Sequence, residues 1–187
     1  MNEEERLEQM EMEVPRKSTR EEEELSSIGD EDEHTWGNIM SGKYEGIKRL
    51  DIRGCSLEYA RFEALLKFLE YAECGLLEMD IHNNNIGPEW ASKLGKALTT
   101  NVSLTKIDLS CNPLLDTGVG SIAPSLEMRA SNFSAVKELN LRDCQLGPGG
   151  AAALAAALRG NASLGLLNLS GNTLGDAGAE AVAALFA

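Results

Sequence analysis

The chain has 187 residues, of which 43% are hydrophobic and only 5% aromatic, enough for one domain with a core of mainly aliphatic side chains. Its 17 Lys and Arg against 30 Asp and Glu give a net charge of −13. This acidic balance argues against a nucleic-acid or membrane surface, because both of those partners favour clustered basic side chains. We therefore expect neither a nucleic-acid partner nor a membrane partner.

The negative charge is concentrated in residues 1–41, where 14 acidic and 4 basic side chains give a net charge of −10. Residues 42–187 hold the remaining 16 acidic and 13 basic side chains, a net charge of −3. Charge runs with few large apolar residues do not offset the entropy of ordering the backbone. We predict a mostly disordered acidic segment over residues 1–41 and a folded domain over residues 42–187. An acidic arm for a basic partner is the alternative for the segment.

The N-terminus reads Met-Asn-Glu-Glu-Glu-Arg and has no apolar core of a signal peptide. No unbroken apolar run reaches the roughly 18 residues that a membrane span needs. We therefore expect a cytoplasmic, intracellular protein. Its four cysteines, Cys55, Cys74, Cys111 and Cys144, are expected to stay reduced, and no pair has the Cys-x-x-Cys spacing of a zinc site.

After Lys43 the pattern L-x-x-L-x-L-x-x-N/C-x-L occurs five times. The residues at its Asn/Cys position are Cys55, Asn84, Asn112, Cys144 and Asn172. They stand 29, 28, 32 and 28 residues apart, and further apolar positions follow eight and twelve residues after each motif. The L-x-L alternation predicts a short strand, and the later positions spaced by four predict a helix. Each repeat is therefore expected to bury its apolar faces against its neighbours.

These motifs resemble the leucine-rich repeats of the ribonuclease-inhibitor-like class, over residues 46–187 and most clearly over residues 164–187. The resemblance implies an α/β solenoid, a short curved arc of about five strand–helix repeats with a parallel sheet on its concave face. It also implies a protein-binding role, since similar repeats occur in immune receptors, in ribonuclease inhibitor and in cytoskeletal and flagellar scaffolds. Association with the cytoskeleton or a flagellum is thus a further expectation.

The Asn/Cys position has a structural interpretation, because the chain turns sharply after each strand and leaves backbone groups without a ladder partner. Buried amides at Asn84, Asn112 and Asn172 are expected to satisfy those groups. Cys55 and Cys144 would fill the same position as weakly hydrogen-bonding substitutes. Three repeats apart, the two lie roughly 14 Å from each other, too far for a disulfide. We interpret both as core thiols rather than nucleophiles.

Local signals predict where helices begin and end. Gly87-Pro88 and Gly147-Pro148 are expected to open helices, since proline is tolerated in a first helical turn. An Asn-x-Ser triplet follows three of the helices, at Asn101, Asn132 and Asn161. We interpret these asparagines as helix terminators in a left-handed backbone conformation, not as glycosylation sites.

The third repeat is four residues longer than its neighbours and carries Pro124 within its expected helix. A kink or break is expected there. The extra segment, Glu127 to Ser131, is interpreted as a tolerated insertion, with a second contact site as the alternative.

Side chains between and beside the L-x-L positions are expected to form columns on the solvent side of the sheet. The residues that we predict to bind a protein partner there are Arg49, Asp51, Arg53, Glu78, Asp80, His82, Lys106, Asp108, Glu138, Asn140 and Arg142. Leu166, Asn168, Ser110 and Ser170 complete the columns. A face of mixed sign suits a protein with complementary charges better than a polyanion.

Asp51, Asp80 and Asp108 are expected to lie in a row about 5 Å apart, where like charges repel. We expect Arg49, Arg53 and Lys106 to neutralise this row, and a bound cation is the alternative. His82 lies beside Asp80, with no serine or cysteine demonstrably in reach. The sequence therefore predicts no catalytic, cofactor or metal site.

The predicted function is that of a non-enzymatic interaction module or scaffold that holds a protein on the concave face. The alternative is a regulator of a small GTPase, because the repeats are also similar to those of Ran GTPase-activating protein. That family is longer and carries its acidic stretch after the repeats, whereas here the acidic run precedes five repeats.

Both ends of a solenoid expose apolar surface unless they are capped. Trp36, Ile39, Met40 and Tyr44 are expected to cover the N-terminal end. At the other end, we expect an exposed apolar flank that associates with other molecules, formed by Val182, Leu185 and Phe186. A partner, a second copy or a further part of a longer gene product would cover it.

Overall fold

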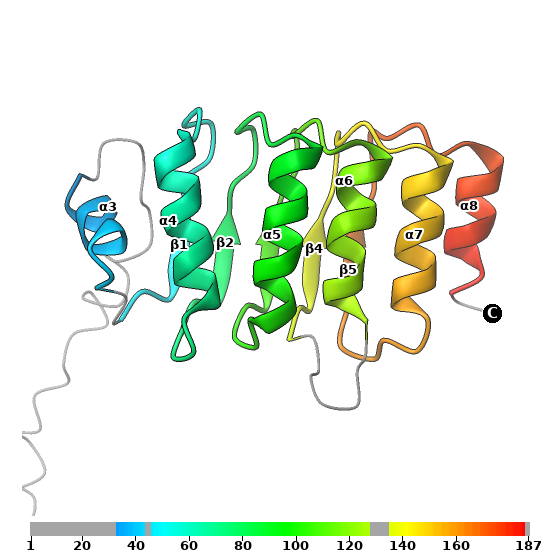
Figure 1. Ribbon diagram of the computed structural model, residues 1–187. Coiled ribbons are helices and arrows are strands. Elements are labelled where there is room, and N and C mark those ends of the chain that lie inside the picture. Colours follow the sequence, from blue (N-terminus) through cyan, green and yellow to red (C-terminus); the bar gives the residue numbers. More distant parts are fainter. Residues whose placement is uncertain (1–32, 44–45, 128–134, 186–187) are drawn as a thin grey trace, which may run out of the picture.

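The computed structural model describes residues 33–43, 46–127 and 135–185 (Figure 1). The strands are Arg49–Asp51 (β1), Glu78–Asp80 (β2), Lys106–Asp108 (β3), Glu138–Asn140 (β4) and Leu166–Asn168 (β5). The α-helices are Glu33–Met40 (α3), Tyr59–Glu70 (α4), Pro88–Thr100 (α5), Leu115–Ile122 (α6), Pro148–Leu158 (α7) and Gly175–Ala183 (α8). Each of the five strands is thus followed by one helix, as the repeat predicts.

The strands form one parallel sheet in the order β1-β2-β3-β4-β5, with no shift in register from repeat to repeat. The middle residue of every strand points to the same side, and these residues are Leu50, Met79, Ile107, Leu139 and Leu167. The first four are 1–2% exposed, and Leu167 is half-buried against the same core. The predicted inner row of apolar residues is therefore confirmed.

Helices α4 to α8 stand side by side on one side of the sheet (Figure 1). Their buried positions include the expected columns, for example Leu65 and Leu69 in α4 and Leu94 and Leu98 in α5. The other side of the sheet carries no helix in the described part of the chain. The predicted α/β solenoid of strand–helix repeats is confirmed.

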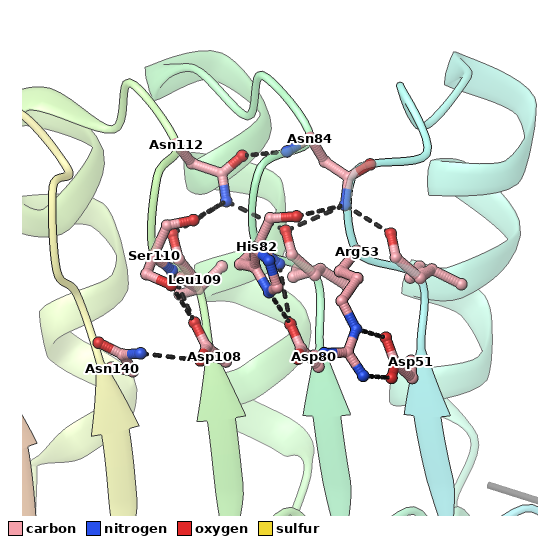
Figure 2. Close-up of polar contacts among 12 residues, drawn as sticks. Asp51, Arg53, Asp80, His82, Asn84, Asp108, Leu109, Ser110, Asn112 and Asn140 are labelled. Carbon is pink, nitrogen blue, oxygen red and sulfur yellow. Dashed lines mark hydrogen bonds and ion pairs between the residues drawn. The ribbon is translucent and has the colours of Figure 1, made fainter. Parts of the chain in front are cut away.

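A ladder of asparagine amides joins the turns that follow the strands (Figure 2). Asn112 Oδ1 accepts hydrogen bonds from the backbone N–H groups of Asn84 and Ile86, at 2.9 and 3.0 Å. Its Nδ2 donates to the carbonyls of Ile81 and Leu109, at 3.1 and 2.9 Å. The amide thus satisfies backbone groups in its own repeat and in the preceding one, which confirms the structural role predicted for this position.

The two cysteines at the same position act as expected. The Cys144 thiol is buried and lies 3.3 Å from the carbonyl oxygen of Leu109. Burial raises the pKa of Cys144 to about 12, so the thiol stays protonated and unreactive near neutral pH. Cys55 is half-buried against the core, and its thiol lies 3.2 Å from the carbonyl of Arg53.

Helix starts follow the prediction, but the role of the helix-terminating asparagines differs from it. Gly87 and Gly147 are the N-cap residues of α5 and α7, each followed by proline. Asn101, at the end of α5, has an extended backbone (φ −76°, ψ 127°), so the predicted left-handed conformation is wrong there. Its side chain instead donates to the carbonyl of Leu69 at 3.0 Å, which ties the end of α5 to the end of α4.

Asn161 repeats this arrangement at the end of α7. Its Nδ2 donates to the carbonyl of Leu126 at 2.7 Å, while its Oδ1 accepts from the N–H groups of Ser163 and Leu164. Asn161 is not among the described residues with a positive φ. The amide therefore terminates the helix through side-chain hydrogen bonds; Asn132 lies outside the described residues.

Pro124 breaks the third helix as predicted. Helix α6 ends at Ile122 and continues as a short 3₁₀ helix, Ala123–Leu126 (η1), that contains the proline. Beyond Glu127, the rest of the predicted insertion lies outside the described residues, so both interpretations of that segment stay predictions.

Helix α3 covers the N-terminal end of the solenoid next to α4 (Figure 1). Trp36 and Ile39 are buried, and the Arg61 guanidinium lies 5.3 Å from the centre of the Trp36 ring. Met40 is 56% exposed, so its predicted part in the cap is wrong: it ends the helix on the side that faces solvent. Tyr44 and residues 1–32 lie outside the described residues, and the domain boundary at 41/42 stays a prediction, with α3 on its N-terminal side.

At the C-terminal end, Leu169 and Leu174 are only partly buried, unlike their counterparts in the inner repeats. Val182 and Leu185 are also partly buried, and Phe186 lies outside the described residues. What covers this flank stays a prediction. None of the described helices is long and apolar enough to cross a membrane.

Candidate protein-binding face

The side of the sheet opposite the helices carries the predicted site residues in three columns, which we call the sheet face. The first residues of the five strands form the first column: Arg49, Glu78, Lys106, Glu138 and Leu166. The third residues form the second: Asp51, Asp80, Asp108, Asn140 and Asn168. The third column, two residues further on, comprises Arg53, His82, Ser110, Arg142 and Ser170. The structure therefore brings the eight predicted site residues of the strands onto one surface, and Arg53 and His82 contact the aspartates of that surface.

Two ion pairs run across neighbouring strands in the first column. Arg49 Nε lies 3.3 Å from Glu78 Oε1, and Lys106 Nζ lies 3.3 Å from Glu138 Oε2. The prediction that Arg49 and Lys106 neutralise the aspartate row is thus wrong. Residues opposite each other in one column are about 4.8 Å apart, closer than residues two positions apart along a strand, and Arg49 and Lys106 each pair within the first column.

Arg53 is the cation that does reach the aspartate row. Its guanidinium makes a two-pronged contact with the Asp51 carboxylate, with Nε 2.8 Å from Oδ1 (Figure 2). This hydrogen bond, followed by the charge of Asp51, raises the pKa of Arg53 above its ordinary value. The charges of Asp80 and Asp108 add to the same effect. Arg142 turns away to its sequence neighbour Asp143, at 2.9 Å.

Asp80 and Asp108 are held by hydrogen bonds from side chains that are not lysine or arginine (Figure 2). His82 Nδ1 lies 2.8 Å from Asp80 Oδ1, and the backbone N–H of His82 donates to the same oxygen. Asp108 accepts from the hydroxyl of Ser110 at 2.6 Å and from the amide of Asn140 at 2.8 Å. These contacts orient both carboxylates, and none of them comes from a lysine or an arginine.

The pairing pattern leaves a local charge excess. Each Lys or Arg of the sheet face has a carboxylate partner: Arg49 with Glu78, Arg53 with Asp51, Lys106 with Glu138, and Arg142 with Asp143. Asp80 and Asp108 lie opposite each other on β2 and β3, and no Lys or Arg of the described chain forms an ion pair with either. These two neighbouring carboxylates are therefore the ones of the face that lack a lysine or arginine ion-pair partner in the described chain, and the charge of Arg53 acts on both only from its position beside Asp51.

The sheet face is hollowed at two places. A hollow of about 470 Å³ lies over β1 to β3, with Asp51, Asp80 and Asp108 in its lining. A second, of about 210 Å³, lies over β3 to β5, and its lining includes Asp108, Asn140 and Leu166. Asp108 and Lys106 contribute to both hollows, which therefore adjoin.

Leu166 gives the C-terminal part of the face a different character. It occupies the first column, where the other four strands carry charged residues, and it is 51% exposed. It also lines a third hollow of about 150 Å³, together with Leu158, Leu164 and Leu185. The face thus changes from acidic over β2 and β3 to apolar at β5.

A cation site would use Asp80, His82 and Asp108, which can offer ligand atoms within 4.8 Å of one another. Calcium prefers six to eight oxygen ligands, and zinc prefers four ligands with nitrogen or sulfur prominent among them. The hydrogen bonds described above already engage each of the three side chains. The bound cation stays an alternative to the hydrogen-bonded arrangement.

Two features of the site were not among the sequence predictions. Asp143 was not singled out, although as the immediate neighbour of Arg142 it was an obvious partner in charge. Leu166 was placed in its column but not among the binding residues; the signal was an apolar residue in a column that is otherwise charged.

The fold and this face define a solenoid of strand–helix repeats with a polar, hollowed strand side. A family model described as "Leucine Rich repeat" matches residues 100–123, 136–155 and 160–183. Ribonuclease inhibitor of Sus scrofa is 36% identical over 135 residues, which cover 69% of this chain and 27% of the relative. "NACHT, LRR and PYD domains-containing protein 5" of Bos taurus is 28% identical over 145 residues, 78% of this chain and 13% of the relative.

Two solved structures share the fold. "Leiomodin-1 Actin-Binding Site 2 (ABS2)" aligns with a TM-score of 0.56 and 22% identity, covering 66% of this chain and 71% of that one. The C-terminal domain of tropomodulin from Caenorhabditis elegans aligns with a TM-score of 0.61 and 14% identity, covering 80% of this chain and 87% of that one. The chain is therefore a leucine-rich-repeat protein, and its repeats are of the ribonuclease-inhibitor-like type. It spans between about an eighth and about a quarter of the length of the two curated relatives named above.

Proposed function

We propose that this chain is a non-enzymatic interaction module that binds another protein on its sheet face. The observation that carries the proposal is the hollow of about 470 Å³ lined by charged side chains from three adjacent strands. Rigid strands hold these side chains in fixed columns, which is the arrangement that gives a binding surface electrostatic specificity. The predicted contact residues are those named for this face in the sequence analysis, from Arg49 to Arg142.

The charge pattern favours a protein over a nucleic acid as the partner. Phosphate backbones select for surfaces with unpaired Lys and Arg. Here the four cations of the face are each paired with a carboxylate, and the net excess is negative. An intracellular location fits the free thiols of the four cysteines, and it stays part of the proposal.

Affinity capture with matched charge reversals tests the proposal. The test variant carries Asp80→Lys, Lys106→Glu and Arg142→Glu on the sheet face. The control carries Lys96→Glu, Arg159→Glu and Glu180→Lys, exposed positions outside the three columns, with the same net change in charge. We expect partner proteins that the control retains to be lost from the test variant. Partners retained equally by both would overturn the proposal.

Actin is a defined protein for a first direct binding measurement, because the similar leiomodin structure is that of an actin-binding site. A shared fold does not carry a binding site with it, so actin is a test protein and not the proposed partner. The GTPase-regulator alternative predicts a different result: the chain would raise the GTP turnover of a client GTPase, which an interaction module leaves unchanged.

A further inference from the structure

We propose that the sheet face recognises a partner segment with a basic side chain over Asp80 and Asp108 and a large apolar side chain beside Leu166. This inference rests on the proposed function and specifies the chemistry of the partner. It combines two independent observations: Asp80 and Asp108 on β2 and β3 have no lysine or arginine ion-pair partner in the described chain, and Leu166 on β5 is exposed.

The basic side chain is required by the charge balance of the face. Asp80 and Asp108 lie side by side in the second column, where two like charges repel. A guanidinium or ammonium group between them would relieve that repulsion and find both carboxylates already oriented by His82, Ser110 and Asn140. The hollow in front of them has room for such a side chain.

The neighbouring cations do not compete strongly for this position. Arg49 and Lys106 are engaged by glutamates of their own column, and Arg53 is engaged by Asp51. An acidic partner side chain would have to displace one of these carboxylates, whereas a basic one can approach Asp80 and Asp108 without breaking an ion pair with a lysine or an arginine. The face therefore discriminates between the two signs of charge.

The apolar contact is set by Leu166. Its side chain is half-exposed and lines both the hollow over β3 to β5 and the hollow at the C-terminal flank. Covering it with a large apolar side chain removes hydrocarbon surface from water, which is worth about 0.8 kcal/mol for each buried methylene group. Its neighbour across the strands, Glu138, is already paired with Lys106, and Asn140 and Asn168 carry no charge.

The distance between the two contacts constrains the segment. Leu166 lies two strands from Asp108 and two residues nearer the start of its strand. At about 4.8 Å between strands and about 3.3 Å per residue, the separation is about 12 Å. An extended peptide spans that distance in about four residues, and a helix in about eight.

Fluorescence anisotropy with a defined set of labelled peptides tests the inference. Each peptide has a Gly/Ser background with Arg, Gln or Glu at one position and Leu or Ser at a second, three to eight residues later. We expect the tightest binding from Arg combined with Leu, and at least roughly tenfold weaker binding when Glu replaces Arg.

Isosteric variants of the intact chain assign each contact. Asp80→Asn with Asp108→Asn removes charge but keeps shape, and we expect it to abolish the preference for Arg over Gln while the preference for Leu remains. Leu166→Ala is expected to lower the affinity for Leu-containing peptides about tenfold and to leave the charge preference intact. The matched controls, Asp176→Asn with Glu180→Gln, and Val102→Ala, change exposed residues outside the three columns and should have no effect.

The outcomes separate this inference from the proposed function. Absence of peptide binding, no preference for Arg over Gln, or a preference that survives the Asp-to-Asn variant would overturn the inference. If a captured partner is lost with the charge reversals but not with these neutral variants, the inference falls and the proposed function stands. If capture does not depend on the sheet face at all, both fall. Circular dichroism confirms that each variant is folded.

Discussion

The side chain of Asn112 links two adjacent repeats of the solenoid through hydrogen bonds. Its amide makes five hydrogen bonds to backbone groups of two adjacent repeats, and the side chain is completely buried. Asn172 makes the equivalent five bonds in the last repeat, but it is only partly buried. The two side chains make equivalent hydrogen bonds, but water reaches Asn172 and does not reach Asn112.

We predict that Asn112→Ala lowers the free energy of unfolding by about 3 kcal/mol, because buried backbone groups lose partners that water cannot replace. Asn172→Ala is expected to cost less than half as much, since water reaches the exposed turn. Urea-induced unfolding of both variants measures the difference. Equal losses would show that solvent access does not control how much these amide hydrogen bonds stabilise the fold.

Because of Cys144, we expect the stability of the protein to vary with pH in the alkaline range. Burial raises its pKa from an ordinary value of 9.0 to about 12, so the unfolded chain gives up this proton at a lower pH than the folded chain. Between those two values the folded state binds more protons, and stability therefore falls as pH rises. Below pH 9 the full stabilising contribution is present.

The comparison of wild type with Cys144→Ala isolates this effect, because the two proteins differ only in this side chain. We predict that the stability advantage of the wild type shrinks by more than about 1 kcal/mol between pH 8 and pH 11. Denaturant unfolding at each pH measures it. Parallel stability curves would contradict the assignment of a raised pKa to the buried thiol.

At the scale of whole elements, helices α5 and α6 approach each other more closely at Gly95 than a side chain allows. A Cβ atom at Gly95 would collide with the backbone carbonyl of Ser121. Gly120, in the adjacent helix, has open space around the position of its missing Cβ. One glycine is thus required by packing, and the other is not.

We predict opposite effects of the same substitution at these two positions. Gly95→Ala is expected to destabilise the fold by about 2 kcal/mol, because the helices must separate. Gly120→Ala is expected to stabilise it by about 0.5 to 1 kcal/mol, the usual gain in helix propensity. Thermal unfolding of both variants is the measurement, and a stabilising Gly95→Ala would rule out the close helix contact.

The order of elements follows from the sequence because each apolar column occupies the same position in every repeat. Leu50 and Leu139 are three repeats apart, and both fall in the buried row. The helix-terminating role of Asn101 could not be derived from composition alone, since asparagine ends helices either by a left-handed backbone or by side-chain hydrogen bonds. The backbone N–H groups of Ser103 and Leu104 donate to the side-chain oxygen of Asn101. The Asn-x-Ser-Leu pattern was therefore the available signal in the sequence.

The sequence predicted which strand side chains lie on the solvent side of the sheet, but it did not predict which carboxylate each cation contacts. The alternation within each strand placed Arg49, Asp51 and Lys106 on the solvent side, as observed. Which carboxylate each cation contacts depends on distances between strands, and these favour Glu78 and Glu138 over the aspartate row. Asp116 shows a similar limit: it accepts a 2.6 Å hydrogen bond from Gly147 at the start of α7, a contact 31 residues distant in the sequence.

At the scale of the whole molecule, stability is distributed unevenly along the solenoid. Inner repeats are covered on both sides, whereas β5 pairs with one strand in the described chain and Leu167 and Leu169 are partly exposed. In repeat proteins each module depends on its immediate neighbours, so a module with one neighbour opens more easily.

We predict that backbone amides of β5 and α8 exchange with deuterium faster than those of β3 and α5, by at least about tenfold. Hydrogen exchange followed by mass spectrometry measures this at peptide resolution. Uniform protection would contradict the gradient and would point to a second copy or another protein covering the flank at Val182 and Leu185.

Because neighbouring strands pair without a shift in register, each repeat adds the same distance along the sheet face. Splicing one additional 28-residue unit between β3 and β4, matching the spacing from Asn84 to Asn112, would move Leu166 one strand further from Asp108. The new strand would have to carry an asparagine at the position of Asn140 and a glutamate at that of Glu138, because these two residues contact Asp108 and Lys106. Module number would then set the length of the segment that can bridge the two contacts. Selectivity for ligand length would then be adjusted by duplicating the module that carries these two residues.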